Sequence, residues 1–207
     1  MKEIKLPETL TTINSSAFAD CVTLKMLYIP KNVNSINYIN GALANLKGLL
    51  SIVVDPANQT YESPNGCNGV IKKEGKSLVV ACQNTIIPEG VSSIYGFQNQ
   101  NMLESIAIPS SVTDVLYNTF YNCTNLKSVV AKCDTPPTLG NNAFAGINAD
   151  CVLTVPKGKK QAYINAGWTT DIFKGGIVED ESQFDANQDG TVDITDVTKL
   201  VNVILGK

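Results

Sequence analysis

A repeating pattern of apolar residues runs along most of this chain of 207 residues. In four copies, an aliphatic residue and a proline are followed by an aliphatic residue three positions later and by isoleucine or valine six positions later. The prolines of these copies are Pro7, Pro30, Pro88 and Pro109. Self-similarity with fixed internal spacing indicates stacked structural units, each of which buries its apolar side against its neighbours.

A second apolar block follows each of the four copies, with further apolar residues 6, 9 and 11 positions after its first residue, and a fifth block follows the last of them. The blocks begin at Phe18, Leu43, Phe97, Phe120 and Phe144. In the last block, Asp150 stands where the others have leucine. A departure of this kind is typical of the terminal repeat, where stacking stops.

This spacing predicts one short strand per turn. The clearest candidates are 27–29, 52–54 and 106–108, and a proline follows the first and third directly. Since proline has no backbone N–H, we expect it to mark the strand end. Stacking then places the strands side by side in a parallel sheet and the block-leading residues in one buried column. The predicted fold class is a solenoid of short parallel β-strands with an irregular or short-helical convex side.

The repeat spacing also reveals an insertion. Pro30 and Pro88 are 58 residues apart, whereas Pro7 and Pro30 are 23 apart. Within the extra residues, 69–71 and 77–81 have the pattern of a β-hairpin, and the turn between them carries a glycine. We expect this hairpin to project from the solenoid. Cys67 and Cys82 flank it and are the one cysteine pair for which a disulfide stays open; the other cysteines are expected to be small apolar fillers.

A calcium-binding loop is predicted over residues 185–196. Oxygen-bearing side chains stand at loop positions 1, 3, 5, 9 and 12, with Gly190 at position 6, where the chain must turn sharply. The predicted ligands are Asp185, Asn187, Asp189, Thr191 through its backbone carbonyl, Asp193 and Asp196. Alternating oxygen ligands suit Ca²⁺, a hard cation that prefers six to eight oxygens. The alternative is an acidic, solvated turn that matches by coincidence.

A helix is predicted after this loop, because apolar residues from Ile194 to Leu205 recur at helical spacing. Residues 179–184 read as an acidic linker. The expected organisation is therefore a solenoid over 1–178, a linker over 179–184 and a calcium loop with its helix over 185–207.

The solenoid resembles the BspA-type leucine-rich repeats of bacterial surface proteins. The resemblance is carried by two motif copies: Ala17, Phe18, Cys21, Leu24 and Lys25, and Phe120, Cys123, Leu126 and Lys127. It implies a leucine-rich-repeat solenoid, secreted or exposed at the cell surface, that acts in adhesion or protein interaction.

Residues 185–207 resemble one half of a type I dockerin. Dockerins bind cohesin domains in extracellular assemblies and carry two such segments, where this chain carries one. The resemblance implies Ca²⁺ binding and a cohesin-like partner. The contact positions that it implies are Ile194, Thr195, Val201 and Asn202.

Composition excludes several function classes. The net charge of −3 and the pI near 5.0 provide no basic patch for nucleic acid. No apolar run approaches the roughly 20 residues needed to cross a bilayer, and the N-terminus lacks the apolar stretch of a signal peptide. We therefore expect either a cytosolic protein or one whose leader has been removed, and the family resemblance favours the second. The chain has no histidine, which removes Ser-His and Cys-His catalytic pairs.

These observations favour a binding protein over an enzyme. The expected ligand is a protein or a glycan, bound by the solenoid, while the calcium segment anchors the chain or stabilises its end. The outward strand positions are Tyr28, Val53, Ala107, Val130 and Thr154. An accessory glycan-binding or glycan-degrading role in an extracellular assembly stays open, as does a purely structural role in which these positions form an ordinary sheet surface.

Overall fold

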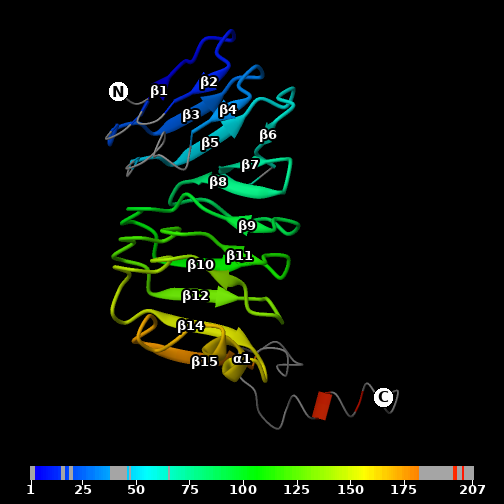
Figure 1. The fold of residues 1–207 in the computed structure, drawn as a ribbon, viewed down its shortest axis with the longest axis vertical. Coiled ribbons are helices and arrows are strands. Elements are labelled where there is room, and N and C mark those ends of the chain that lie inside the picture. Colours follow the sequence, from blue (N-terminus) through cyan, green and yellow to red (C-terminus); the bar gives the residue numbers. More distant parts are fainter. Residues whose placement is uncertain are drawn as a thin grey trace.

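A computed structural model describes residues 3–14, 17–18, 21–37, 46, 48–64, 66–181, 198–199 and 202. The predicted calcium loop, residues 185–196, lies outside this part of the chain. The described chain forms a β-solenoid whose turns stack along one axis, with the N-terminus at one end and the last strands at the other (Figure 1).

One side of the solenoid is built from parallel strands. β1 (Glu3–Ile4), β3 (Met26–Ile29) and β5 (Ser51–Val54) form one sheet. β10 (Ser105–Ile108), β12 (Ser128–Ala131), β14 (Val152–Pro156) and β15 (Gly176–Asp180) form another. The strands predicted at 27–29, 52–54 and 106–108 are confirmed within β3, β5 and β10. The strands carry alternating buried and outward residues, so one face packs inward and the other stays accessible.

A second set of strands lies after the prolines. β2 (Thr12–Ile13) pairs with β4 (Ser35–Ile36) in a two-stranded sheet. A larger, six-stranded sheet has the order β13 (Thr138–Leu139), β11 (Asp114–Val115), β9 (Ser93–Ile94), β8 (Ser77–Ala81), β7 (Gly69–Lys72) and β6 (Tyr61–Glu62). The isoleucine or valine six positions after each repeat proline lies in β2, β4, β9 or β11 and is buried. This repeat position therefore builds a second wall of the core.

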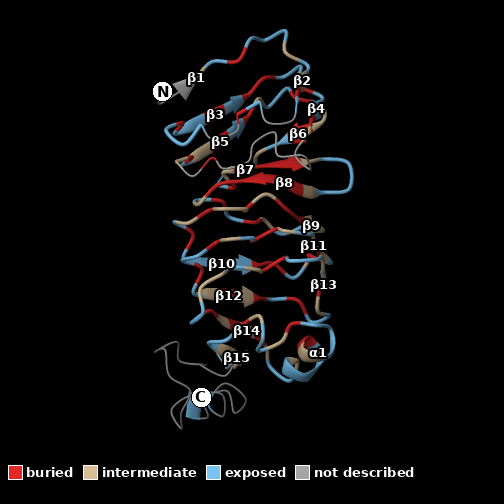
Figure 2. Cartoon of the chain, turned by 60° about the vertical axis from the view of Figure 1, so that its left-hand side comes forward, coloured by how far each residue is buried: buried red, intermediate tan, exposed pale blue. Residues whose placement is uncertain are grey.

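The inserted hairpin is present, but the expectation that it projects is wrong. β7 and β8 pair antiparallel inside the larger sheet, and β8 continues in parallel to β9. Val70 and Val80 pack into the N-terminal hydrophobic cluster, whereas Ile71 and Leu78 pack into the C-terminal one. Strands that are apolar at consecutive positions bury both faces. The hairpin is therefore a layer between two cores (Figure 2).

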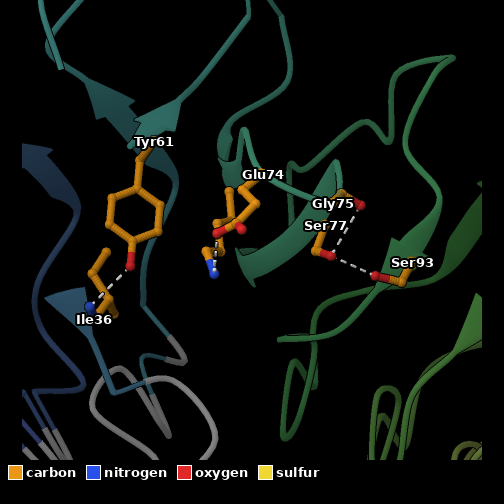
Figure 3. Close-up of polar contacts among 7 residues, drawn as sticks. Ile36, Tyr61, Glu74, Gly75, Ser77 and Ser93 are labelled. Atoms are coloured by element: carbon orange, nitrogen blue, oxygen red, sulfur yellow. Dashed lines mark hydrogen bonds and ion pairs between the residues drawn. The ribbon is translucent and has the colours of Figure 1, made fainter. Parts of the chain in front are cut away.

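Polar contacts tie the insertion to the turns on both sides. The backbone N–H of Ile36 donates to the Tyr61 hydroxyl at 3.0 Å, which joins β4 to β6. On the other side, the Ser93 hydroxyl donates to the Ser77 hydroxyl at 2.7 Å, which joins β9 to β8 (Figure 3). The first of these contacts is buried, so it is shielded from competing water.

An aromatic column runs through the C-terminal core, as the block-leading residues predict. The rings of Phe97 and Phe120 have their centroids 4.9 Å apart, and Phe120 and Phe144 are separated by the same distance. Phe18 is also buried, while Leu43 lies outside the described residues. Asp150 is exposed, and the adjacent Cys151 fills the core in its place.

The last turn is closed by a cap of aromatic residues around α1 (Lys160–Asn165). Tyr163, Trp168 and Phe173 are fully buried. The Tyr163 hydroxyl donates to the Cys133 carbonyl at 2.8 Å, and the Trp168 ring N–H donates to the Pro137 carbonyl at 3.0 Å. Each polar end is satisfied, which allows the rings to be buried at low cost. Since β15 continues to Asp180, the solenoid includes the first two residues of the predicted linker.

The cysteines are free thiols, including the pair for which a disulfide stayed open. Cys67 belongs to the C-terminal cluster and Cys82 to the N-terminal cluster, on either side of the hairpin layer. Cys123 is a buried column filler, as expected, and its thiol donates to the Phe97 carbonyl at 3.0 Å. Cys21, in the same repeat column, is exposed and is not a buried filler.

This difference predicts the thiol reactivity of the folded protein. Burial raises the pKa of Cys123 to about 12, so little thiolate forms at pH 8. We expect a thiol reagent such as DTNB to modify only the exposed Cys21 rapidly, and the five buried cysteines only after denaturation. Cys21→Ser should remove the fast phase. A fast phase of two or more thiols per chain would contradict the described packing.

Candidate binding surface

The outward positions of the parallel strands form rows within each of the two sheets. The strand register places Ala107 beside Val130, Val130 beside Thr154 and Thr154 beside Val178. A second row contains Ser105, Ser128, Val152 and Gly176. In the N-terminal sheet, Met26 lies beside Ser51 and Tyr28 beside Val53. We call these outward residues of β3, β5, β10, β12, β14 and β15, up to Val178, the strand face (Figure 1).

The strand face has a neutral, moderately apolar character. Its most exposed large residues are Val178 at 46%, Met26 at 44% and Val53 at 41%. The named rows contain small, hydroxyl-bearing or apolar side chains and no charged ones, while Glu3 continues the row of Met26 in β1 and Asp180 ends β15. An uncharged surface of this kind exposes apolar area without a strong preference for ligands of either charge, which suits contact with another macromolecule more than capture of a small ion.

Tyr28 is the aromatic residue of this face, and its hydroxyl is fixed by Asp55. The hydroxyl donates to a carboxylate oxygen of Asp55 at 2.7 Å. This hydrogen bond raises the pKa of Tyr28 to about 12 and lowers that of Asp55, because it stabilises the protonated phenol beside the ionised carboxylate. The backbone N–H of Ala57 also donates to Asp55, at 2.8 Å. Tyr28 thus presents a ring of fixed orientation at neutral pH.

The structure places the five outward positions expected from the sequence in two groups, one in each sheet. Tyr28 and Val53 are direct neighbours in the N-terminal sheet, and Ala107, Val130 and Thr154 are consecutive in the C-terminal one. Sequence reasoning did not single out Met26, Ser105, Ser128, Val152 and Val178. The signal was available, since each stands two positions from a recognised outward residue or at the equivalent position of the next strand.

The predicted metal ligands Asp185, Asn187, Asp189, Thr191, Asp193 and Asp196 lie outside the described residues, as do the partner positions Ile194, Thr195 and Val201. Asn202 is described as helical and exposed. In the described part of the chain, no three Cys, Asp or Glu side chains gather in a group that could hold a metal ion. No helix there is long and apolar enough to cross a membrane.

Two solved structures align with this chain. The pneumococcal vaccine antigen PcpA aligns with a TM-score of 0.50 at 18% identity, over 75% of this chain and 51% of that one. A leucine-rich repeat protein from Eubacterium ventriosum aligns with a TM-score of 0.46 at 20% identity, over 86% of this chain and 54% of that one. The chain thus spans about half the length of these two proteins. At 18% identity, the similarity to PcpA shows the fold alone.

The repeats themselves show the family. No curated protein matches the sequence significantly. The family model described as the BspA type leucine rich repeat region matches in six copies, over residues 1–63 and 79–166. These ranges cover more than half of the chain and leave out most of the inserted hairpin. The chain therefore belongs to the family of proteins with BspA type leucine-rich repeats.

Proposed function

We propose that this chain is a secreted or cell-surface bacterial binding protein, whose strand face contacts another macromolecule in adhesion or protein interaction. The observation that carries the proposal is the uninterrupted, uncharged row from Ala107 through Val130 and Thr154 to Val178. Neighbouring strands hold these side chains at fixed spacing, so little entropy is lost when a partner covers them. Membership of the BspA type repeat family supports the same role.

A paired charge substitution tests this proposal. We expect Ala107→Arg with Thr154→Arg to weaken binding to the native cell surface, or to a partner recovered from it, at least tenfold. The reason is that two guanidinium groups would have to be desolvated in a neutral contact. The matched control is Lys127→Arg with Lys132→Arg, which changes two exposed positions on either side of β12 and keeps the charge. Melting temperatures should stay similar. Unchanged binding by the paired variant would refute the strand face as the contact.

The calcium segment completes the proposed function. Asp185, Asn187, Asp189, Thr191, Asp193 and Asp196 are the proposed Ca²⁺ ligands. The support is the ligand pattern together with the excess of carboxylates between Glu179 and Asp196, where no Lys or Arg is present. Its proposed role is to anchor the protein through a cohesin-like partner or to stabilise the C-terminal end. The proposed cohesin contacts are Ile194, Thr195, Val201 and Asn202.

Calcium titration tests this segment independently of the strand face. We expect calorimetry to detect about one Ca²⁺ per chain, with a dissociation constant between micromolar and millimolar, as in sensor and extracellular sites. Asp185→Ala should weaken binding at least tenfold, whereas Asp171→Ala, an exposed carboxylate elsewhere, should leave it unchanged. If Asp185→Ala binds calcium as the parent chain does, the proposed ligand set is wrong.

A glycan-directed role in an extracellular assembly is a second candidate, favoured by the single observation of Tyr28. An exposed aromatic ring of fixed orientation beside a carboxylate is a surface on which sugar rings can stack. Glycan binding lost in Tyr28→Ala and retained in Tyr121→Ala, another exposed tyrosine, would favour this candidate. Detectable glycan hydrolysis by the purified chain would overturn the expectation of a binding protein instead of an enzyme.

A further inference from the structure

A slot of about 670 Å³ lies at the C-terminal end of the solenoid. One wall is the turn between β13 and β14, including Ala145 and Ile147, and the other includes Ala166, Ile172 and Lys174. None of these residues belongs to the strand face, so the slot is a separate surface. Ile147 and Ile172 are only partly buried, which leaves apolar area open in the slot.

Backbone hydrogen bonds show what normally covers a turn of this kind. In the preceding turn, the N–H groups of Asn118, Phe120 and Asn122 donate to the next turn, to the carbonyls of residues 141, 143 and 145, at 2.7–3.0 Å. One turn earlier, the N–H groups of Phe97 and Asn99 donate in the same way to the carbonyls of residues 119 and 121. Each turn thus accepts through its carbonyls on one side and donates through alternate amides on the other.

The turn that lines the slot has no such acceptor among the described residues. Its equivalent amides are those of Asn142, Phe144 and Gly146, and none of them donates a hydrogen bond to a described residue. Asn142 and Gly146 have positive φ of 56° and 77°, as Asn118 and Asn122 have 53° and 58°, so the backbone keeps the conformation of the preceding turn. These amides therefore keep the donor arrangement of the preceding turn, with no acceptor in the described part of the chain.

The aromatic cap does not serve this row. Phe173 and Trp168 cover the ring of Phe144 at centroid distances of 5.0 and 5.4 Å. The side-chain column is thus closed, while the amides of Asn142, Phe144 and Gly146 beside it have no acceptor among the described residues. Asn142 and Gly146 are exposed, so their amides are open to a partner, and segments that supply carbonyls to such an edge gain affinity from main-chain hydrogen bonds.

We propose that this slot binds a polypeptide segment of another molecule in the conformation of a repeat turn. Its alternate carbonyls accept from the amides of Asn142, Phe144 and Gly146, and one aliphatic side chain packs between Ile147 and Ile172. Residues 140–147 serve as the example of such a segment. Their carbonyls accept the equivalent hydrogen bonds from the amides of the preceding turn. The aromatic position of such a segment must be small, because Phe173 and Trp168 already cover Phe144.

A peptide derived from the chain provides the test. Its sequence is that of residues 140–149 with alanine in place of Phe144, and it is added at about 1 mM, where weak complexes form. We expect the exchange of the amide hydrogens at Asn142, Phe144 and Gly146 to slow at least tenfold in the full-length protein. Ile147→Asp should abolish this protection at unchanged melting temperature. Ile86→Asp, at a residue exposed by 66%, is the matched control and should keep it.

Two results would overturn the inference. One is exchange at these three amides that the peptide leaves unchanged in the parent protein. The other is slow exchange already in the free protein, since the slot would then be covered by residues of the chain itself or of a second copy. Neither result bears on the strand face or on calcium binding, so the proposed function is tested separately.

Discussion

Replacing Phe120 with alanine is expected to lower the free energy of unfolding by about 3–5 kcal/mol, as is usual when a large aromatic side chain is removed from a packed core. Phe120 is fully buried and stacks on two rings, those of Phe97 and Phe144, each at 4.9 Å. In a solenoid each turn is stabilised only by its neighbours. The substitution therefore weakens two interfaces at once and leaves a cavity between them. Urea unfolding followed by the fluorescence of Trp168, the only tryptophan, measures the loss.

The adjacent residue provides the control. Tyr121 has an aromatic ring of similar size but is 45% exposed. Tyr121→Ala should change the free energy of unfolding by no more than about 0.5 kcal/mol, the usual range for surface substitutions. Phe120→Leu should recover part of the stability, since it refills much of the volume. Equal effects of Phe120→Ala and Tyr121→Ala would mean that the aromatic column does not carry the stability of these turns.

The stacked architecture could be predicted because each turn repeats the same constraint. One buried position per turn is weak evidence, but equivalent residues such as Phe97 and Phe120 recur with equal spacing, and only a stacked arrangement buries all of them. The short strands of the second wall were not predicted. Each has a single inward residue of the repeat, such as Ile94, and two-residue strands give no periodicity of their own.

The placement of the hairpin could not be read from the spacing alone. Antiparallel pairing of residues 69–81 follows from the turn signal at Gly75, but spacing does not say whether an insertion leaves the stack or joins it. Consecutive apolar residues decided the outcome. Val79 and Val80 enter one core and Leu78 and Ala81 the other, a pattern that an exposed hairpin would not tolerate.

The two candidate surfaces differ in how far the sequence revealed them. The strand face follows from alternation, since Ala107 and Val130 stand between buried neighbours. The slot does not, because backbone amides carry no sequence signature. It becomes visible only when the ladder from Asn118 to Asn122 is compared with the next turn. For the calcium segment, by contrast, the side-chain pattern of the sequence alone supports the prediction, and calcium titration is its test.

Asn58 is a buried polar residue that joins several backbone segments of the described fold. It is fully buried, and its side-chain amide donates to the carbonyls of Pro30 and Val33 at 2.9 and 2.8 Å. Its side-chain oxygen accepts from the backbone N–H groups of Thr60 and Tyr61 at 2.9 and 2.8 Å. One side chain thus satisfies four backbone groups and joins the second repeat to the insertion.

We expect Asn58→Leu to lower the free energy of unfolding by about 3–6 kcal/mol. An unsatisfied buried polar group costs roughly 1–3 kcal/mol, and the substitution removes the hydrogen-bond partner of four backbone groups at once. Asn58→Asp keeps the acceptor for Thr60 and Tyr61 but places a carboxylate against two carbonyls, so it should also destabilise at pH 7. The loss is measured by urea unfolding, and hydrogen exchange should quicken first in residues 30–36 and 58–62.

A substitution at the neighbouring Gln59 is the control, because it changes the same turn without removing the hydrogen bonds of Asn58. Gln59 is exposed, and its side chain bonds only to the Ala57 carbonyl, at 2.9 Å. Gln59→Leu should therefore change the free energy of unfolding by about 0.5 kcal/mol or less. If Asn58→Leu proved equally mild, the four hydrogen bonds would not be what holds the insertion against the N-terminal repeats. The apolar contacts of Val70, Val79 and Val80 would then have to suffice.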